Sequence, residues 1–262
     1  MSTATRRSWV RHIMGMPVSI HVRGDSPGLL REWAVEEALA ALVEVDRVFS
    51  TYRADSEISR LRSGAIGVQS CSPAVAEVLE LCAEANRLTG GYFSAWLPGP
   101  DGALALDPSG LVKGWAVERA ARALTEGIDD DYYIGAGGDI ALAVRGDTEH
   151  RPPWRVAVED PLHPSRHLGV LELWAGGVAT SGTAHRGSHI VDPITAEPAT
   201  ALASVTVVGP SLLWADVLAT AACARGGDAL SWLDWPAGYH ALAVTAAGRV
   251  LRTDGMAELL AD

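Results

Sequence analysis

The residues best suited to chemistry are an aspartate and a threonine near the end of the chain. Asp216 and Thr220 lie in Ala-Asp-Val-Leu-Ala-Thr (215–220), and a spacing of four places both side chains on one face of a helix. A carboxylate and a hydroxyl are hard oxygen ligands, suited to a Mg²⁺ ion that also binds substrate phosphates. The alternative is a polar stripe on a buried helix, where the carboxylate needs a partner.

A lone lysine is the second candidate. Among 21 Lys and Arg residues only Lys113 is a lysine, in the segment Asp-Pro-Ser-Gly-Leu-Val-Lys-Gly-Trp (107–115). An ammonium group is compact and a guanidinium group is a broad fork, so a single lysine in an arginine-rich chain favours a position where only the ammonium fits. A chance survivor on a solvated helix is the alternative.

Two glycine-containing segments could bind a ligand through their backbone. Gly-Ala-Gly-Gly-Asp, which ends at Asp139, suits a tight turn that a ligand can approach closely, and it is equally typical of an ordinary hairpin. In Ala-Thr-Ser-Gly (179–182), the three residues Thr180, Ser181 and Gly182 can offer hydroxyl and N–H groups to an anion.

His189 is the candidate proton acceptor, because an imidazole titrates near neutral pH. It lies in His-Ile-Val-Asp-Pro (189–193), where a structural histidine at a strand end is the alternative. Ser181, His189 and Asp192 do not indicate a serine hydrolase, since the chain has no Gly-x-Ser-x-Gly segment.

Composition limits the classes of protein that these residues can serve. The chain of 262 residues is 48% hydrophobic and 20% charged, which predicts an ordered protein with a buried core, and we expect one domain over residues 1–262. A net charge of −11 argues against nucleic acid or an anionic membrane surface as the partner.

Three dispersed cysteines indicate neither a zinc site nor a disulfide framework. Without a signal-peptide pattern or an apolar membrane span, we expect a cytoplasmic protein with no membrane anchor.

The elements that must position these residues alternate irregularly along the chain. Helical spacing and capping signals predict helices over residues 29–48, from Ser72-Pro73 to Gly90-Gly91, from about Gly110 through Leu124, and from Pro210-Ser211 through Cys223. Strands are predicted over residues 9–22 (bent at Gly15 and Pro17), 132–134, 140–144, 154–158, 168–174 and 203–208, and residues 241–252 form a hairpin. This order predicts an α+β fold, with a mostly antiparallel sheet flanked by helices.

Taken together, the motifs resemble the ApbE family of FAD:protein FMN transferases over about residues 9–227. The ordered set adds to the segments above Met-Gly-Met-Pro-Val (14–18), Ser-Thr-Tyr-Arg-Ala-Asp-Ser-Glu-Ile-Ser-Arg-Leu (50–61), Gly-Gly-Tyr-Phe (90–93) and Ser-Val-Thr-Val-Val (204–208). The resemblance implies a single T-fold-like domain that binds FAD in a cleft. It also implies a Mg²⁺-dependent reaction, in which FMN passes from FAD to a Thr or Ser hydroxyl of a target flavoprotein and AMP leaves.

The resemblance also implies roles for individual residues. His189 would take the proton from the acceptor hydroxyl, and Mg²⁺ would bind the Gly110 carbonyl, Asp216 and Thr220. The FAD site would include Met16, Tyr52, Tyr92, Phe93, Ser94, Asp107 and Lys113, and we assign to it also Asp139, Thr180, Ser181, Gly182 and Val205.

Two departures from the family pattern bear on the flavin site, because Ser94 and Gly135 stand where members often carry Asp and Asn. Two other functions fit the same residues. An FAD pyrophosphatase would use the metal site with water in place of the acceptor, and a non-catalytic FAD-binding protein would show no turnover.

Overall fold

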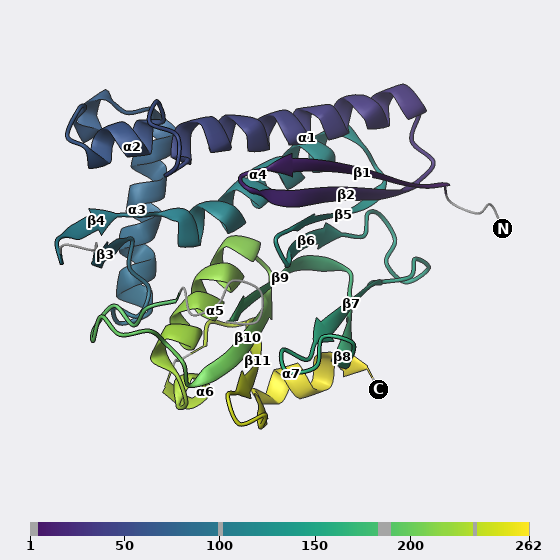
Figure 1. The fold of residues 1–262 in the computed structure, drawn as a ribbon. Helices are drawn as coiled ribbons and strands as arrows, with labels where there is room; N and C mark the ends of the chain where they lie inside the picture. Colours follow the sequence, from purple (N-terminus) through teal and green to yellow (C-terminus); the bar gives the residue numbers. More distant parts are fainter. Residues whose placement is uncertain (1–4, 99–101, 183–189, 233–234, 262) are drawn as a thin grey trace.

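An eight-stranded antiparallel sheet is the centre of the protein. The computed structural model describes residues 5–98, 102–182, 190–232 and 235–261 (Figure 1). The sheet has the order β1-β2-β5-β6-β9-β10-β11-β12. Its strands are β1 (Thr5–Ile13), β2 (Met16–Gly24), β5 (Asp131–Ala136), β6 (Asp139–Ala143), β9 (Ala175–Gly182), β10 (Leu202–Gly209), β11 (His240–Thr245) and β12 (Val250–Arg252). The predicted α+β class with a mostly antiparallel sheet is confirmed.

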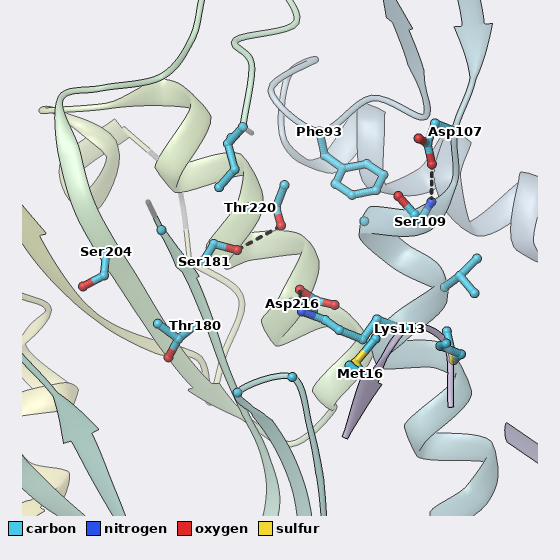
Figure 2. A pocket seen from close by; sticks show the side chains of 18 of the residues that line it. Met16, Phe93, Asp107, Ser109, Lys113, Thr180, Ser181, Ser204, Asp216 and Thr220 are labelled. Carbon is cyan, nitrogen blue, oxygen red and sulfur yellow. Dashed lines mark hydrogen bonds and ion pairs between the residues drawn. The ribbon is translucent and has the colours of Figure 1, made fainter. Parts of the chain in front are cut away.

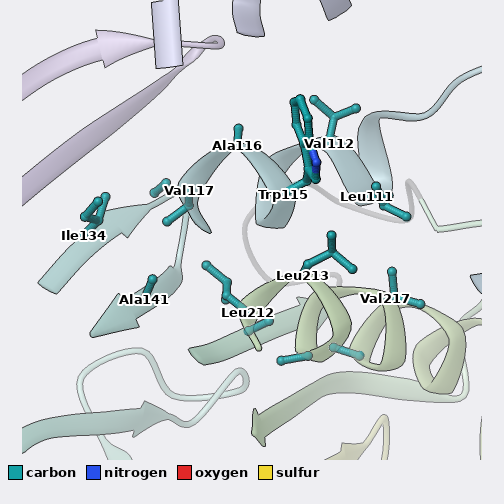
Figure 3. Packing of buried hydrophobic residues seen from close by; sticks show 14 of the residues in the cluster. Leu111, Val112, Trp115, Ala116, Val117, Ile134, Ala141, Leu212, Leu213 and Val217 are labelled. Carbon is teal, nitrogen blue, oxygen red and sulfur yellow. The ribbon is translucent and has the colours of Figure 1, made fainter. Parts of the chain in front are cut away.

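One face of this sheet is covered by helices. α1 (Gly28–Phe49) packs on α4 (Ser109–Gly127), and α4 packs on α5 (Leu212–Arg225). Figure 3 shows Leu213 and Val217 of α5 opposite Leu111 of α4. Further along the two helices, Val117 and Leu212 lie beside Ile134 and Ala141 of the sheet. This side also includes the helices α2 (Glu57–Arg62), α3 (Pro73–Leu88) and α6 (Ala229–Trp232), the 3₁₀ turn η1 (Val68–Ser70), and the two-stranded sheet of β3 (Trp96–Pro98) and β4 (Leu104–Leu106).

The opposite face carries a second, smaller sheet. Its order is β13-β8-β7, formed by β7 (Trp154–Glu159), β8 (His167–Leu173) and β13 (Leu260–Ala261), with α7 (Asp254–Leu259) beside it (Figure 1). Strand alternation divides the core accordingly. Ala179 and Val207 belong to the cluster under the helices, whereas Val178 and Val208 belong to the cluster under the small sheet.

Most predicted elements are confirmed, and two predictions need correction. Residues 9–22 form a hairpin and not one bent strand, because Met14 and Gly15 adopt positive φ angles of 55° and 74°, which a two-residue hairpin turn requires. Ser72 precedes α3 as expected, but its side chain makes no capping hydrogen bond.

β9 was not predicted as a strand, because its sequence Ala-Gly-Gly-Val-Ala-Thr-Ser-Gly carries three glycines and glycine weakens a strand interior. Packing explains one of them: a Cβ atom at Gly177 would lie 2.4 Å from the Leu212 Cα atom of α5. Within the described residues, no helix combines the length and the apolar character needed to cross a membrane.

Candidate active site

A cavity of about 980 Å³ opens where α4, α5 and the ends of the central strands meet. This volume lies at the upper end of the range for ligand pockets, roughly 300–1,000 Å³. It gathers most of the predicted site residues from distant parts of the sequence: Met16, Tyr52, Tyr92, Phe93, Ser94, Asp107, Gly110, Lys113, Thr180, Ser181, Gly182, Asp216 and Thr220. His189 lies outside the described residues.

The first turn of α4 faces this cavity. The Asp107 carboxylate accepts a hydrogen bond from the Ser109 N–H at 3.0 Å, which orders the chain where the helix begins (Figure 2). Gly110 lies under the Phe93 ring, because a Cβ atom there would meet that ring at 3.4 Å. A helix start presents N–H groups that no carbonyl of the helix accepts, and these groups favour an anionic ligand.

The centre of the site is a cluster of one ammonium and two buried carboxylates. The Lys113 Nζ atom lies 2.6 Å from Asp139 Oδ2 and 3.5 Å from Asp216 Oδ1. Asp139 is 0% and Asp216 is 2% exposed. If all three groups are ionised, the two carboxylates and the single ammonium leave the cluster with one net negative charge. Burying such an excess charge is unfavourable unless a ligand or a proton compensates it.

Close helix packing brings Lys113 and Asp216 together. At Gly114, a Cβ atom would lie 2.9 Å from the Leu213 Cα atom and 3.3 Å from the Asp216 Cβ atom, so only glycine lets the two backbones approach this closely. The start of α5 is capped twice, because Ser211 Oγ accepts from the Trp214 N–H at 3.3 Å and Glu118 Oε1 accepts from the Leu213 N–H at 3.2 Å.

The protonation of Asp216 reflects this environment. Burial raises the pKa of Asp216 from its ordinary 3.8 to about 7, the Lys113 ammonium lowers this pKa, and the Asp139 carboxylate raises it. A hydrogen bond from the Gly114 backbone also favours the ionised form of Asp216. The Asp216 carboxylate therefore changes charge near neutral pH when no further cation is present.

Hydroxyl groups line the cavity beside this cluster. Ser181 Oγ and Thr220 Oγ1 lie 3.1 Å apart, and Thr180 Oγ1 and Thr206 Oγ1 lie 2.9 Å apart. In Figure 2, Ser181 points toward Thr220 of α5, while Thr180 and Ser204 lie to one side. The hydrogen bond between Ser181 and Thr220 connects β9 to the helix that carries Asp216.

An aromatic wall forms another part of the cavity. The Arg225 guanidinium donates a hydrogen bond to the Tyr92 hydroxyl and lies 4.9 Å from the Tyr92 ring centroid and 5.5 Å from that of Trp232. Phe93 is fixed through its backbone, because its carbonyl accepts from Asn86 at 2.8 Å. Tyr52, at 99% exposure, lies at the rim.

Two predicted residues are not among those that line the cavity. Val205 is 0% exposed in the core under the helices. Because side chains alternate along a strand, its neighbours Ser204 and Thr206 line the cavity, and the polar–apolar–polar pattern of 204–206 could have identified them. Asp139 is buried and makes contact through Lys113 and through the Thr180 N–H, which donates to Asp139 Oδ1 at 3.2 Å.

The residues fit the predicted divalent cation. Within the described part of the chain, Asp216 Oδ2 is buried and accepts no hydrogen bond, and a buried carboxylate oxygen without a donor needs another partner. The Thr220 hydroxyl and the backbone at Gly110 line the same cavity. Carboxylate, hydroxyl and carbonyl oxygens are the ligand types that Mg²⁺ prefers.

Known proteins resemble this chain in sequence and in fold. The sequence matches the ApbE family over residues 14–98 and 94–243. The chain belongs to the ApbE family. Two curated relatives of this ApbE-family chain are the FAD:protein FMN transferases of Klebsiella pneumoniae (strain 342), 30% identical over 59% of the chain, and of Rhodobacter capsulatus, 36% identical over 51%. The matched region spans 41% and 26% of these two relatives, less than half the length of each.

A longer match joins the chain to the FAD:protein FMN transferase of Haemophilus influenzae, 26% identical over 74% of this chain and 72% of that relative. Solved structures share the fold of this ApbE-family chain. The ApbE protein of Thermotoga maritima has a TM-score of 0.84 at 20% identity, covering 98% of this chain and all of that one. The flavin transferase ApbE from Vibrio cholerae has a TM-score of 0.81 at 23% identity, with the same coverage.

Proposed function

We propose that this protein is a Mg²⁺-dependent FAD:protein FMN transferase. In the proposed reaction, the hydroxyl oxygen of a Thr or Ser in an acceptor flavoprotein forms a bond to the phosphorus of the FMN half of FAD. The bond from this phosphorus to the bridging oxygen breaks, and AMP leaves with that oxygen. The proposal is supported by the curated relatives, whose names state this activity, and by the charge cluster in the cavity.

The observation that carries the proposal is the buried Asp216 oxygen, which has no hydrogen-bond donor among the described residues and lies beside Lys113 and the start of α4. Phosphoryl transfer depends mainly on neutralising charge and on positioning the nucleophile. A Mg²⁺ ion held by Asp216, the Thr220 hydroxyl and the Gly110 carbonyl would neutralise charge on the pyrophosphate and on the departing AMP.

Other residues of the chain would bind the pyrophosphate, contact the flavin and accept the proton. The positive end of the α4 dipole, at the start of that helix, and the Lys113 ammonium provide positive charge toward the pyrophosphate. Tyr92 and Phe93 offer ring surfaces for the flavin at the aromatic wall. His189 is proposed as the base that accepts the proton of the acceptor hydroxyl. A correctly positioned general base typically increases the rate by about 10²–10⁴-fold.

The test is a product analysis with purified protein, FAD, Mg²⁺ and an acceptor flavoprotein. We expect AMP release only when Mg²⁺ is present, together with flavin fluorescence on the acceptor that survives denaturing gel electrophoresis. Free FMN and AMP without labelled acceptor would identify an FAD pyrophosphatase instead. FAD binding without AMP release would identify a non-catalytic FAD-binding protein.

We also propose that the protein works in the cytoplasm. Its three cysteines, Cys71, Cys82 and Cys223, are all free, and free thiols are typical of a reducing compartment. Cell fractionation with an antibody to the native protein tests this location, and recovery in an extracytoplasmic fraction would contradict it.

A further inference from the structure

The Lys113 ammonium is shared unequally between two carboxylates, and this asymmetry has a functional meaning. Lys113 Nζ lies 2.6 Å from Asp139 Oδ2 but 3.5 Å from Asp216 Oδ1. Both carboxylates are buried, yet only Asp216 lines the cavity. The ammonium therefore lies closest to the carboxylate that does not line the cavity, and it pairs at a longer distance with the one that does.

We propose that Asp139 is a positioning residue, which holds the Lys113 ammonium away from Asp216 and so keeps the Asp216 carboxylate available to a divalent cation. This inference rests on the proposed function, because it concerns the same cation. It gives Asp139 a role different from that of a ligand to FAD or to the metal.

The fold fixes the position of the Asp139 carboxylate. Asp139 is the first residue of β6 and follows Gly137 and Gly138, which have positive φ angles of 58° and 99° and form the tight turn from β5. Its Oδ1 atom accepts a hydrogen bond from the Thr180 N–H of β9 at 3.2 Å. Its Oδ2 atom faces Lys113. The carboxylate is thus held between the backbone of the neighbouring strand and the ammonium.

Competition between two cations explains why this arrangement matters. An ammonium and a divalent ion cannot both neutralise the same carboxylate oxygens without repelling each other, and this repulsion is strong where water is excluded. If Asp139 lost its charge, Asp216 would become the nearest carboxylate to Lys113 in the cluster. The ammonium would then move toward Asp216 and weaken cation binding there.

The experiment is a double-mutant cycle read out by Mg²⁺ affinity, measured by isothermal titration calorimetry with Mg²⁺ alone at a pH well above neutrality. Asp139→Asn keeps an oxygen for the Thr180 N–H and removes the charge. We expect it to weaken Mg²⁺ binding by about tenfold or more, a change of ~1.4 kcal/mol. Lys113→Met removes the competing ammonium and should bind Mg²⁺ at least as tightly as the unmodified protein.

The double variant Asp139→Asn/Lys113→Met decides between a positioning residue and a metal ligand. If Asp139 only positions Lys113, removing both should restore the affinity to within about threefold of the unmodified protein, because the two effects are coupled. If Asp139 is itself a ligand, the double variant will stay as weak as Asp139→Asn, and the inference is overturned. Unchanged affinity in Asp139→Asn would also overturn it.

A matched control separates this effect from general damage. Asp130→Asn changes another buried aspartate in an ion pair, 2.7 Å from Arg31, and Asp130 does not line the cavity. We expect a lower melting temperature and unchanged Mg²⁺ affinity, whereas an equal loss of affinity in this variant would overturn the inference. If the unmodified protein binds Mg²⁺ but the double variant does not regain Mg²⁺ affinity, the role of Asp139 is refuted and the proposed function stands. A folded protein that binds no Mg²⁺ refutes both.

Discussion

Two buried ionic clusters in this protein are built on opposite principles. Outside the cavity lining, the Asp130 carboxylate pairs with Arg31 at 2.7 Å and accepts from the Ser26 N–H at 2.9 Å. The Arg31 guanidinium also donates to the carbonyls of Gly24 and Ser26, at 3.0 and 3.1 Å. One positive charge meets one negative charge, and both carboxylate oxygens accept a hydrogen bond.

Among the described residues, the carboxylates of the cavity cluster outnumber its ammonium group, so we call this cluster unbalanced. Two buried carboxylates share the Lys113 ammonium, and Asp216 Oδ2 accepts no hydrogen bond from any described residue. A balanced and saturated pair needs nothing further, so it serves the fold. An unbalanced one is costly to the fold and is typical of a site that a ligand completes. Under the proposed function, the difference between these two clusters separates a structural ion pair from one that a ligand completes.

Removing the unbalanced charge should have the largest effect. We expect Asp216→Asn to lower Mg²⁺-dependent AMP release by about 10²–10³-fold, the size typical of losing one group that stabilises charge in a transition state. Its melting temperature without Mg²⁺ should not fall below that of the unmodified protein, because an excess buried charge is removed. AMP release from FAD and thermal unfolding measure the two effects, and near-normal turnover would contradict the role of Asp216.

Breaking the balanced pair should have the opposite profile. Asp130→Ala leaves the Arg31 guanidinium buried without its carboxylate, a change that costs about 3–5 kcal/mol of unfolding free energy. Denaturant unfolding measures this loss. The rate of AMP release per folded molecule should stay normal, and a selective loss of turnover would show that the two clusters are not separate.

Separating the helices should disturb the unbalanced cluster through its geometry. Gly114→Ala places a Cβ atom 2.9 Å from the Leu213 Cα atom, and overpacking of this kind costs about 1–3 kcal/mol. We expect lower Mg²⁺ affinity together with lower stability. Gly28→Ala, at the first residue of α1, is the control, because a Cβ atom there meets nothing within 4 Å. If Gly114→Ala and Gly28→Ala changed Mg²⁺ affinity and stability equally, close helix packing at Gly114 would not explain the result.

The smallest predicted effect is a pH dependence confined to one cluster. Because burial raises the pKa of Asp216 from 3.8 to about 7, its protonated form is favoured in the folded state. The resulting stabilisation of the folded state is complete at a pH below the pKa of Asp216 in the unfolded chain, and it is lost as the pH rises through about 7. Without Mg²⁺, the melting temperature of the unmodified protein should therefore fall relative to that of Asp216→Asn over this range. A constant difference between the two would contradict the raised pKa.

The sequence was informative where local signals decide the structure. The helix that carries Asp216 and Thr220 could be predicted from its apolar pattern and from the start at Pro210-Ser211, and Ser211 does cap it. The shared face of Asp216 and Thr220 follows from helix geometry alone. Both side chains accordingly line the same cavity.

Long-range packing decided the features that were missed. The glycine-rich strand β9 could not be inferred locally, because Gly177 is required by the approach of Leu212 from a helix 35 residues further along the chain. The turn before Asp139 was correctly expected to be tight. The burial of the Asp139 carboxylate, however, depends on the pairing of β6 with β9, because the Thr180 N–H of β9 donates a hydrogen bond to Asp139. Met14 gave no local signal for its positive φ angle.

The Asp216 oxygen that has no donor in the described part of the chain also links the contents of the cavity to the folding equilibrium. A cation that binds Asp216 in the folded chain and not in the unfolded chain shifts the equilibrium toward the folded state by mass action, by about 2.7 kcal/mol at a concentration 100 times its dissociation constant. The melting temperature of this protein should then rise with the concentration of free cation, while the balanced pair at Asp130 contributes nothing to that rise. Thermal unfolding thereby becomes a measure of site occupancy that requires neither FAD nor an acceptor.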